Sequence, residues 1–553
     1  MQRQKLRVVL LASLAVALIA PASRAGSIFD FDDKNPPPPA KPATPQKAEP
    51  PHVEPITSKP EPEPARPQPN EAPTAPAPSL KPVPTTAELQ RVGKLFKEVY
   101  AADLADRSPA ARRTLAMRLL DEAAKAESTP TDQFVMLSGA RQAAQEAADL
   151  PLCEQAVDAM AAAFDVNAFT LKLDSAFKMT LKSDSAANTG GNVRTALALL
   201  DQLVAAEDFS DASRLSTLMT RAAADDPMYS LIAEHRARDL DAIRVAYDRI
   251  SKDVAKLRTS PDDPAASFAV GRWLAFYVGD WPRALPLLAK GSDANLKTLA
   301  AAEVGKSTDV DGILSAAEGW WKLAEAQPEL SKRQIRGHAA ELYQANYADL
   351  IGLRKDLADG RISEGFYSPG ARAIDLLALA DTKRDSAEGK WTKTPDGLAA
   401  GNADSRLELP YHPPGEYIFR VEFICRGGNH TVYQGLSAGG AACCWTVGWE
   451  RWTGFEDINR LGIEKNPAHL RLTDPIQDNR LYVSTVEVRG GELRGYLDNR
   501  LLVDWKAGYR SMKIPDMRYP RDPLRLAVGT AVSGASFIRI EVLELAEGGK
   551  IVK

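Results

Sequence analysis

Hydrophobic and polar residues alternate with a period of two along Leu481–Trp505. Gly490-Gly491 and Asp498-Asn499 interrupt the alternation. Period-two patterning around Gly-Gly or Asx pairs is typical of β-hairpins. The stretch therefore predicts three short strands joined by two tight turns. We expect them to form the central framework of a β-sandwich, with Tyr496 and Trp505 in its core.

From about Thr86 to Ala380, apolar residues recur at intervals of three and four, which is typical of amphipathic helices. Thr85 or Thr86 before the first helix, and Ser108-Pro109 before a later one, are N-terminal capping signals. Ser183–Asn192 is rich in Ser, Asn and Gly and predicts a break. The main helices expected are Ala110–Glu127, Asp132–Ala148, Leu152–Asp165, Ala168–Lys182, Val193–Ala206, Asp211–Ala224 and Met228–Leu257.

Two stretches in this region, Ala265–Gly291 and Ala316–Leu350, each predict two helices around a turn. In the first, Gly279-Asp280-Trp281 forms the turn. Small residues would let the paired helices approach closely, and aromatic residues would fill the gaps between them, as in tetratricopeptide-type hairpins. Two imperfect copies indicate stacked antiparallel helix pairs.

After about Ala380, helix formers give way to Gly, Pro, Val, Ile and aromatic residues. Many short strands without intervening helices predict an all-β sandwich. The strands expected are Gly389–Lys393, Gly397–Ala400, Ser405–Leu409, Glu416–Cys425, Thr431–Leu436, Cys443–Val447, Leu481–Arg489, Leu493–Leu497, Arg500–Trp505, Leu524–Thr530 and Ser536–Leu545.

Arg406–Phe423, Leu493–Trp505 and Leu524–Leu545 resemble segments of laminin-G/concanavalin A-like jelly-roll domains, especially those of planctomycete-type secreted proteins. Gly279–Asp293 and Gly319–Glu325 resemble the tetratricopeptide-like helical regions that accompany such domains. The resemblance implies a multidomain α + β protein whose sandwich binds a ligand, often a carbohydrate, at strand-end loops or on the concave sheet. It assigns no active site, because related folds include both glycosidases and adhesion modules.

The N-terminus predicts an export signal. Arg3, Lys5 and Arg7 precede the apolar run Val8–Ala20, and Ser23-Arg24-Ala25 suits cleavage. The alternative is an uncleaved anchor, but the run is shorter than the ~20 residues that span a bilayer. We therefore expect a secreted or periplasmic protein with no stable membrane span after cleavage.

The predicted organisation has four parts. A signal peptide (1–25) precedes a proline-rich linker (26–85), which has too few apolar residues to fold. A helical, repeat-like region (86–380) and a sandwich (381–553) follow. The formal charge of −4 argues against nucleic-acid binding.

The spacing of the cysteines fits no zinc pattern, because no second Cys or His pair accompanies Cys425, Cys443 and Cys444. No cofactor motif stands in its required context. A disulfide from Cys425 to Cys443 or Cys444 is chemically allowed in an oxidising compartment. Sequence alone does not decide it.

Hydrolytic chemistry has two candidate patterns. Gly435–Gly439 matches the G-x-S-x-G elbow around Ser437, followed by Asp457 and His469, but a strand-to-helix turn is required and the neighbourhood predicts strands. Paired carboxylates of a glycosidase could come from Glu416 and Glu422 on one predicted strand, or from Glu541 and Glu544 on another. Solvated charges on the outer face of the sheet explain these acids equally well.

The stretch Cys444–Asn466 is unusually aromatic. Sugar rings stack on exposed aromatic rings while polar side chains bind the hydroxyls, although large aromatics are more often buried. We expect Trp445 to be buried. The candidate ligand-binding residues are Trp449, Trp452, Asn429, His430 and Asp457.

These patterns predict an exported, non-catalytic binding protein. Its sandwich would recognise a glycan or cell-envelope ligand, and its helical region would be a scaffold. The alternatives are a protein-interaction scaffold, with a protein partner held on the helical region, and a glycan hydrolase.

Overall fold

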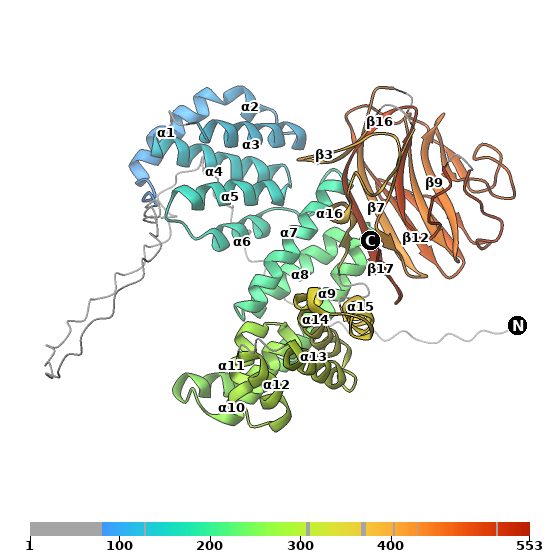
Figure 1. Cartoon of the computed structure of the whole chain (residues 1–553). Coiled ribbons are helices and arrows are strands. Elements are labelled where there is room, and N and C mark those ends of the chain that lie inside the picture. Colours follow the sequence, from blue (N-terminus) through green and yellow to red (C-terminus); the bar gives the residue numbers. More distant parts are fainter. Residues whose placement is uncertain are drawn as a thin grey trace, which may run out of the picture.

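The structure is a computed structural model that describes residues 80–125, 129–305, 310–365, 372–401, 404–428, 430–515 and 518–552, and only the backbone of Ser363. The expected signal peptide (1–25) and residues 26–79 of the expected linker lie outside these residues. An α-helical region is followed by a β-sandwich, as the sequence predicts (Figure 1). No described helix is long and apolar enough to cross a membrane.

The helices begin where local capping signals place them. Thr85 caps the first helix through a reciprocal capping box with Glu88, and Ser108 caps the third, with Pro109 as its first residue. The helices of this region are α1 (Thr86–Val99), α2 (Ala101–Ala105), α3 (Pro109–Ala123), α4 (Pro130–Glu146), α5 (Leu150–Ala163), α6 (Ala168–Lys178), α7 (Ala186–Ala205), α8 (Phe209–Ala223), α9 (Tyr229–Thr259), α10 (Pro264–Trp273), the π-helical turn η1 (Leu274–Val278), α11 (Trp281–Lys290), α12 (Ala294–Val304), α13 (Val310–Ala324), α14 (Glu329–Ala345), the 3-10 turn η2 (Tyr347–Asp349) and α15 (Leu353–Gly365).

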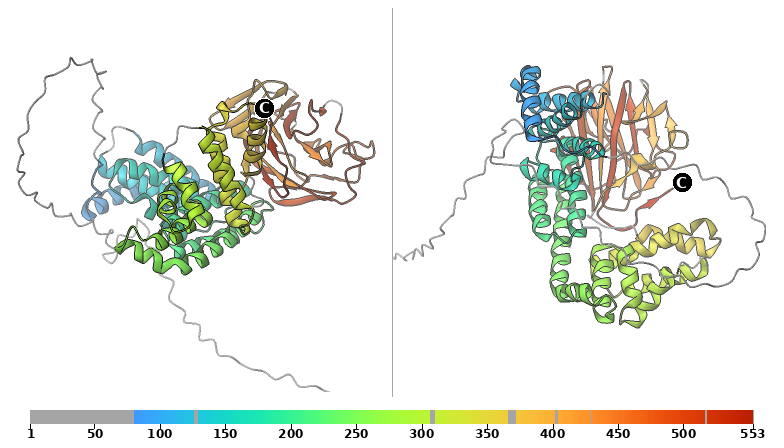
Figure 2. Two further views of the ribbon diagram at one scale, coloured as in Figure 1. Left: turned by 60° about the horizontal axis from the view of Figure 1, so that its bottom comes forward. Right: turned by 90° about the vertical axis from the view of Figure 1, so that its left-hand side faces the viewer.

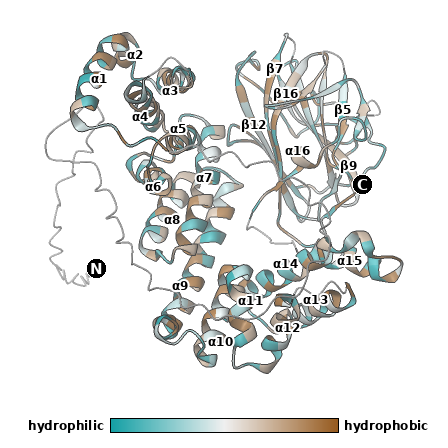
Figure 3. Ribbon diagram, turned by 60° about the vertical axis from the view of Figure 1, so that its left-hand side comes forward, coloured by the Kyte–Doolittle hydropathy of each residue, from teal (hydrophilic) through white to brown (hydrophobic). Residues whose placement is uncertain are grey.

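Consecutive helices pack against each other along the region. α10 packs on α11, and α13 packs on α14, which are the two helix pairs expected from the sequence. α1–α6 and α10–α15 form two blocks, and α7–α9 lie between them beside the sandwich (Figures 1 and 2). The helices carry both hydrophobic and hydrophilic faces, as stacking on one side requires (Figure 3).

The sandwich consists of two antiparallel sheets and a small two-stranded pair. The first sheet has eight strands in the order β14-β13-β12-β7-β16-β4-β3, with β1 also paired to β16; the second has seven in the order β11-β10-β9-β8-β15-β5-β2. The strands are β1 (Ile374–Asp375), β2 (Ser386–Glu388), β3 (Trp391–Thr394), β4 (Gly397–Ala400), β5 (Ser405–Glu408), β6 (Tyr411–His412), β7 (Tyr417–Arg426), β8 (Thr431–Ala438), β9 (Ala441–Trp449), β10 (Trp452–Phe455), β11 (His469–Arg471), β12 (Leu481–Arg489), β13 (Glu492–Leu497), β14 (Arg500–Trp505), β15 (Ala527–Ala531), β16 (Gly534–Glu544) and β17 (Lys550–Ile551), with the short helix α16 (Leu376–Leu379) after β1.

The double hairpin predicted at Leu481–Trp505 is confirmed as β12, β13 and β14. Its expected central position is wrong for β14, which is an edge strand of the eight-stranded sheet. Trp505 packs against the sandwich core. Tyr496 does not, because its register partner is Thr485 and its hydroxyl contacts Glu487 at 3.3 Å.

The core between the sheets is apolar and contains no disulfide among the described residues. All four cysteines are buried free thiols. Burial raises the pKa of Cys425 and of Cys444 to about 12, so neither carries appreciable thiolate near neutral pH. These cysteines act as small core residues.

The outer face of the eight-stranded sheet is covered by the helical region. Ile418 on β7 and Leu543 on β16 belong to the same buried cluster as the helix cores. Beside them, Arg420 is fully buried and its guanidinium contacts Asp226, between α8 and α9, at 2.5 Å. Burial opposes the charge on Arg420, but the neighbouring carboxylates outweigh it and raise the pKa of the guanidinium.

Further polar contacts complete this interface. The hydroxyl of Tyr229 donates to Glu541 at 2.9 Å, and the amide of Asn499 donates to Asp226 at 3.2 Å. Arg194 on α7 lies 3.7 Å from Glu422 and 3.6 Å from Glu541. The buried charges of the sheet are therefore paired with groups from the helices.

A break between α6 and α7 is confirmed and includes Ser183–Ser185, but the predicted extent to Asn192 is wrong, because α7 already begins at Ala186, capped by Ser185. Gly190 and Asn192 have low helix propensity, but both make tertiary contacts at these positions. A Cβ on Gly190 would lie 2.8 Å from the Tyr229 ring and 2.9 Å from the guanidinium of Arg420. Asn192 is fully buried and bonds the amide of Leu150 at 2.7 Å.

Replacing Gly190 with alanine should destabilise the protein by about 1–2 kcal/mol in urea unfolding. Gly→Ala within a helix normally stabilises by about 0.5–1 kcal/mol, but here the added methyl group would clash with Tyr229 and Arg420, whose polar ends are locked by buried bonds. Gly360→Ala in α15 is the matched control, because no atom lies within 4 Å of its added Cβ. It should stabilise, and the same sign for both variants would contradict this packing.

Asp226→Asn should cost about 3 kcal/mol of unfolding free energy, because it removes a charge partner of Arg420 inside the interface while keeping the shape of the side chain. Adding Arg420→Met should recover part of the loss, since no unpaired charge then remains. Asp262→Asn, in the exposed pair with Lys290, should leave the unfolding midpoint unchanged, because solvent screens that pair. Equal effects at the two aspartates would refute a buried interface pair.

Candidate functional site

Two tryptophans lie on one face of a tight hairpin at the end of β9 and β10. Trp449 and Trp452 are register partners across the hairpin, so they share a face, and both are partly exposed. Glu450 and Arg451 form the two-residue turn with φ of 46° and 74°. Positive φ at both positions matches the twist of a type I′ hairpin.

Hydrogen bonds to Leu472 and a close backbone contact at Gly448 fix the position of the hairpin. The guanidinium of Arg451 donates to the carbonyl of Leu472 at 2.8 Å, and the Leu472 amide donates to the Arg451 carbonyl at 2.8 Å. Gly448 has φ of 90°, and a Cβ there would lie 2.5 Å from the carbonyl oxygen of His430. Only glycine fits this approach.

Strand β11 adds polar groups beside Trp452. Arg471 is the register partner of Trp452, and its guanidinium lies 5.4 Å from the ring centroid. The His469 ring meets Trp452 edge-on at 4.9 Å. Its Nδ1 contacts the carbonyl of Asn466 and therefore carries the proton, which leaves Nε2 of the neutral ring as an acceptor. We call Trp449, Trp452, His469 and Arg471 the aromatic patch.

Trp445, on the same strand as Trp449, is fully buried, as expected. Its indole N–H donates to Ser484 at 3.0 Å, and a Cβ on Gly495 would lie 2.2 Å from its ring. The aromatic residues of this stretch therefore divide into a core ring and a surface pair.

The other predicted ligand-binding residues lie elsewhere or outside the described residues. Asn429 is among the latter. His430 is largely buried before β8, and its Nε2 lies 3.1 Å from Asp478. Asp457 follows the far end of β10, five residues from Trp452, or about 16 Å along an extended strand. The structure thus groups Trp449 with Trp452 but does not bring Asp457 to them.

Sequence reasoning missed Arg471 as a site residue and considered His469 only for a triad. β11 has three residues, which is too short for a periodic signal. Its register against β10, set across the intervening loop, is what places both side chains beside Trp452. A charged residue two positions after a histidine is the only signal the sequence offers.

The structure gives the residues of the two candidate hydrolytic patterns positions that do not suit catalysis. Ser437 lies within β8, which continues into β9 through a hairpin, so the strand-to-helix elbow is absent there. His469 lies three strands away in the same sheet, about 14 Å by strand spacing. Glu422 and Glu541 are buried against the helices and paired with Arg194 and Arg539.

The outer face of the seven-stranded sheet is also covered, by the segment that follows β14. There the buried Arg518 donates to Thr446 at 2.8 Å and contacts Glu456. Within the described residues, no group of three or more His, Cys, Asp or Glu side chains is placed to hold a metal ion. The aromatic patch lies at one edge of this sheet, on β9, β10 and β11.

No family model matches the chain. No curated protein matches it either.

Three of the solved structures that match part of this chain are the following. The carbohydrate binding module CBM66 from Bacillus subtilis is 16% identical, with 29% of this chain and 94% of that chain covered and a TM-score of 0.22. A protein of unknown function with a galectin-like fold from Bacillus subtilis is 12% identical, with 34% and 100% covered and a TM-score of 0.23. A putative glycosyl hydrolase from Parabacteroides distasonis is 10% identical, with 32% and 100% covered and a TM-score of 0.23.

Gly448→Ala should destabilise the protein by about 2 kcal/mol more than Gly440→Ala in urea unfolding. Both glycines have positive φ, at 90° and 80°, so both substitutions strain the backbone. Only at Gly448 would the methyl group also collide with a carbonyl, because nothing lies within 4 Å of a Cβ on Gly440. Equal losses would contradict the close approach that supports the hairpin.

Proposed function

We propose that this protein binds a carbohydrate through the aromatic patch. The observation that carries the proposal is the pairing of Trp449 with Trp452 on one rigid hairpin face, with Arg471 and His469 beside them. A preformed arrangement of this kind loses little conformational entropy on binding.

The chemistry of the patch suits a sugar ring. A pyranose has an apolar C–H face and a polar rim of hydroxyls. Partly exposed indoles offer apolar area with a polar N–H, and they lose little rotamer freedom. Arg471 can donate to hydroxyl oxygens, and Nε2 of His469 can accept from a hydroxyl. The ligand is therefore a polysaccharide or glycan of the cell envelope, held without a metal or cofactor.

The proposal includes export and a scaffold role. The basic and apolar segments within residues 1–25 support a cleaved signal peptide, which would deliver the patch to a compartment where such glycans occur. Sequencing the N-terminus of the mature protein should find it close to Gly26. The helical region, with its tetratricopeptide-like pairs, would hold the sandwich by covering one face.

A non-catalytic role is supported better than hydrolysis. Glu422 and Glu541 are two of the four carboxylates that the sequence offered for glycoside cleavage. They are buried at 3% and 4% exposure and paired with arginines, so they are not accessible to a glycan.

The double variant Trp449→Ala/Trp452→Ala of the full chain should weaken glycan binding at least about tenfold, which is about 1.4 kcal/mol. Binding would be measured by affinity electrophoresis through gels containing each member of a panel of neutral and acidic polysaccharides. Tyr519→Ala is the control, because Tyr519 is 54% exposed and lies outside the patch. It should bind as the unmodified protein does.

Because the two tryptophans are surface residues, the double variant should keep its unfolding midpoint within a few degrees of the unmodified protein. A protein that binds no member of the panel, or a double variant that binds normally, would disprove the proposed site. Trp452→Phe retains an aromatic face and should keep part of the affinity.

A further inference from the structure

The last helix of the helical region exposes an apolar face. α15 packs on α14 and ends the α10–α15 block (Figures 2 and 3). Its buried side includes Ala358, which joins a small cluster with Tyr343. On its outer side Leu353 is 85% exposed and Leu357 46%, and Ile351, just before the helix, is 82% exposed. We call these three aliphatic residues the α15 face.

The α15 face is unusual for the end of a helical stack. Leu353 and Leu357 are four residues apart, so they lie on the same side of the helix. Terminal helices of such stacks normally turn a polar surface to solvent. Single exposed aliphatic residues are common, but among the described residues no other stretch this short exposes three. A grouped apolar surface of this kind marks an interaction site.

Opposite charges flank the apolar residues. Successive residues turn by about 100° around a helix, so Arg354 lies on one flank of the Leu353–Leu357 stripe and Asp356 on the other. Arg354 pairs with Asp311 on α13, but both side chains are more than half exposed. Such a pair contributes little and can be exchanged for another.

We propose that the α15 face joins two copies of this chain. Two α15 helices lying side by side, about a two-fold axis parallel to them, would bury Leu353 and Leu357 of each copy against the same residues of the other. The same axis brings opposite flanks together, so that Arg354 faces Asp356 of the partner subunit. A two-fold contact requires a surface that is complementary to itself in this way.

The charges around the face favour a second copy over other occupants. The exposed charged residues of the segment are two cations and three anions, namely Arg354, Lys355, Asp349, Asp356 and Asp359. An anionic bilayer or a nucleic acid would require an excess of cations. A peptide of one charge sign would match only one flank. Three aliphatic side chains offer less than the roughly 800 Å² that each partner buries in a stable complex, so the dimer is weak.

Sedimentation equilibrium of the full chain tests the dimer. The protein should be monomeric at about 1 µM and largely dimeric at about 500 µM, as a contact of micromolar affinity requires. Leu353→Ser/Leu357→Ser should stay monomeric throughout and keep its unfolding midpoint, because both leucines are exposed. Val245→Ser is the matched control on α9, where the side chain is 43% exposed, and it should dimerise normally. Trp449→Ala/Trp452→Ala should also dimerise, which separates this face from the proposed glycan site.

Charge reversal tests the pairing across the axis. Arg354→Asp and Asp356→Arg should each weaken self-association at least about tenfold, because each places like charges opposite one another. An equimolar mixture of the two variants should dimerise again, since every contact in the mixed dimer regains opposite charges.

Three results would overturn the proposal: an unmodified chain that is monomeric at 500 µM, normal association of the double serine variant, or a variant mixture that stays monomeric. Vesicles of phosphatidylcholine and phosphatidylglycerol probe the main competing occupant. Sedimentation of a monomeric unmodified chain with these vesicles, lost in the double serine variant, would also overturn it and assign the face to a lipid surface.

Discussion

The buried pair of Arg420 and Asp226 determines how the two regions of this chain can be arranged. A fully buried guanidinium must have a charged partner, and the partner comes from the turn between α8 and α9. Docking α7 and α9 at that point covers the outer face of the eight-stranded sheet and buries Glu422 and Glu541. The outer face of the eight-stranded sheet is thus a contact surface between the two regions, and the proposed glycan site lies at an edge of the other sheet.

The regular elements could be predicted from local pattern. β12 and β14 have the same bounds in the sequence prediction and in the structure, because both are short runs rich in apolar residues and Gly-Gly and Asp-Asn pairs mark their turns. The start of α7 could not be predicted in this way. Its Gly190 and Asn192 are poor helix formers, and they are favoured only by contacts with Tyr229, Arg420 and Leu150 that lie far away in sequence.

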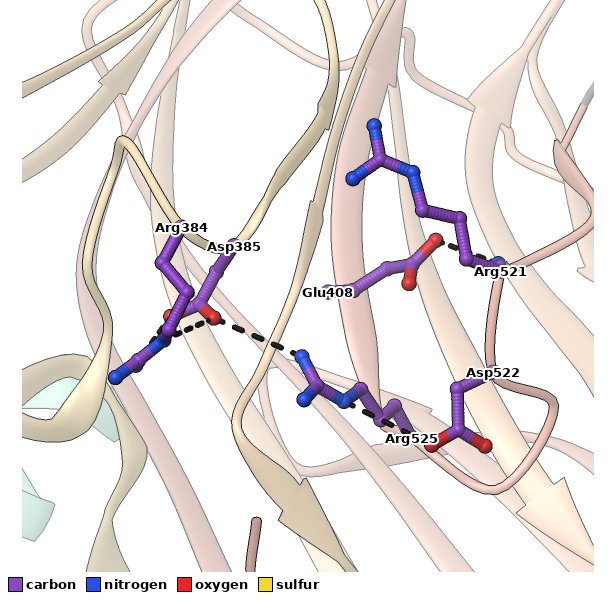
Figure 4. Close-up of a pocket in the computed structure, with 6 residues that line it drawn as sticks. All are labelled: Arg384, Asp385, Glu408, Arg521, Asp522 and Arg525. Carbon is purple, nitrogen blue, oxygen red and sulfur yellow. Dashed lines mark hydrogen bonds and ion pairs between the residues drawn. The ribbon is translucent and has the colours of Figure 1, made fainter. Parts of the chain in front are cut away.

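The candidate sites were only partly predictable for the same reason. The aromatic composition of the stretch pointed to Trp449 and Trp452. The same stretch gave no sign that Asp457 would lie at the other end of β10, away from them. His469 and Arg471 reach the patch through the register of a three-residue strand. A charged pocket beside β2 and β5 unites Asp385, Glu408 and Arg525, which in sequence resemble ordinary solvated charges (Figure 4). Topology, and not residue type, assembles both places.

The strand order of the seven-stranded sheet also determines how far apart its two edge strands lie. Six interstrand steps separate β11 from β2, which corresponds to roughly 29 Å across the sheet. Under the proposed function, a polymeric ligand held by the aromatic patch at one edge would bring more distant parts of itself to the opposite edge. Any second contact there would form at the high effective concentration set by the first. Selectivity would then depend on the spacing of groups along a glycan as well as on their chemistry.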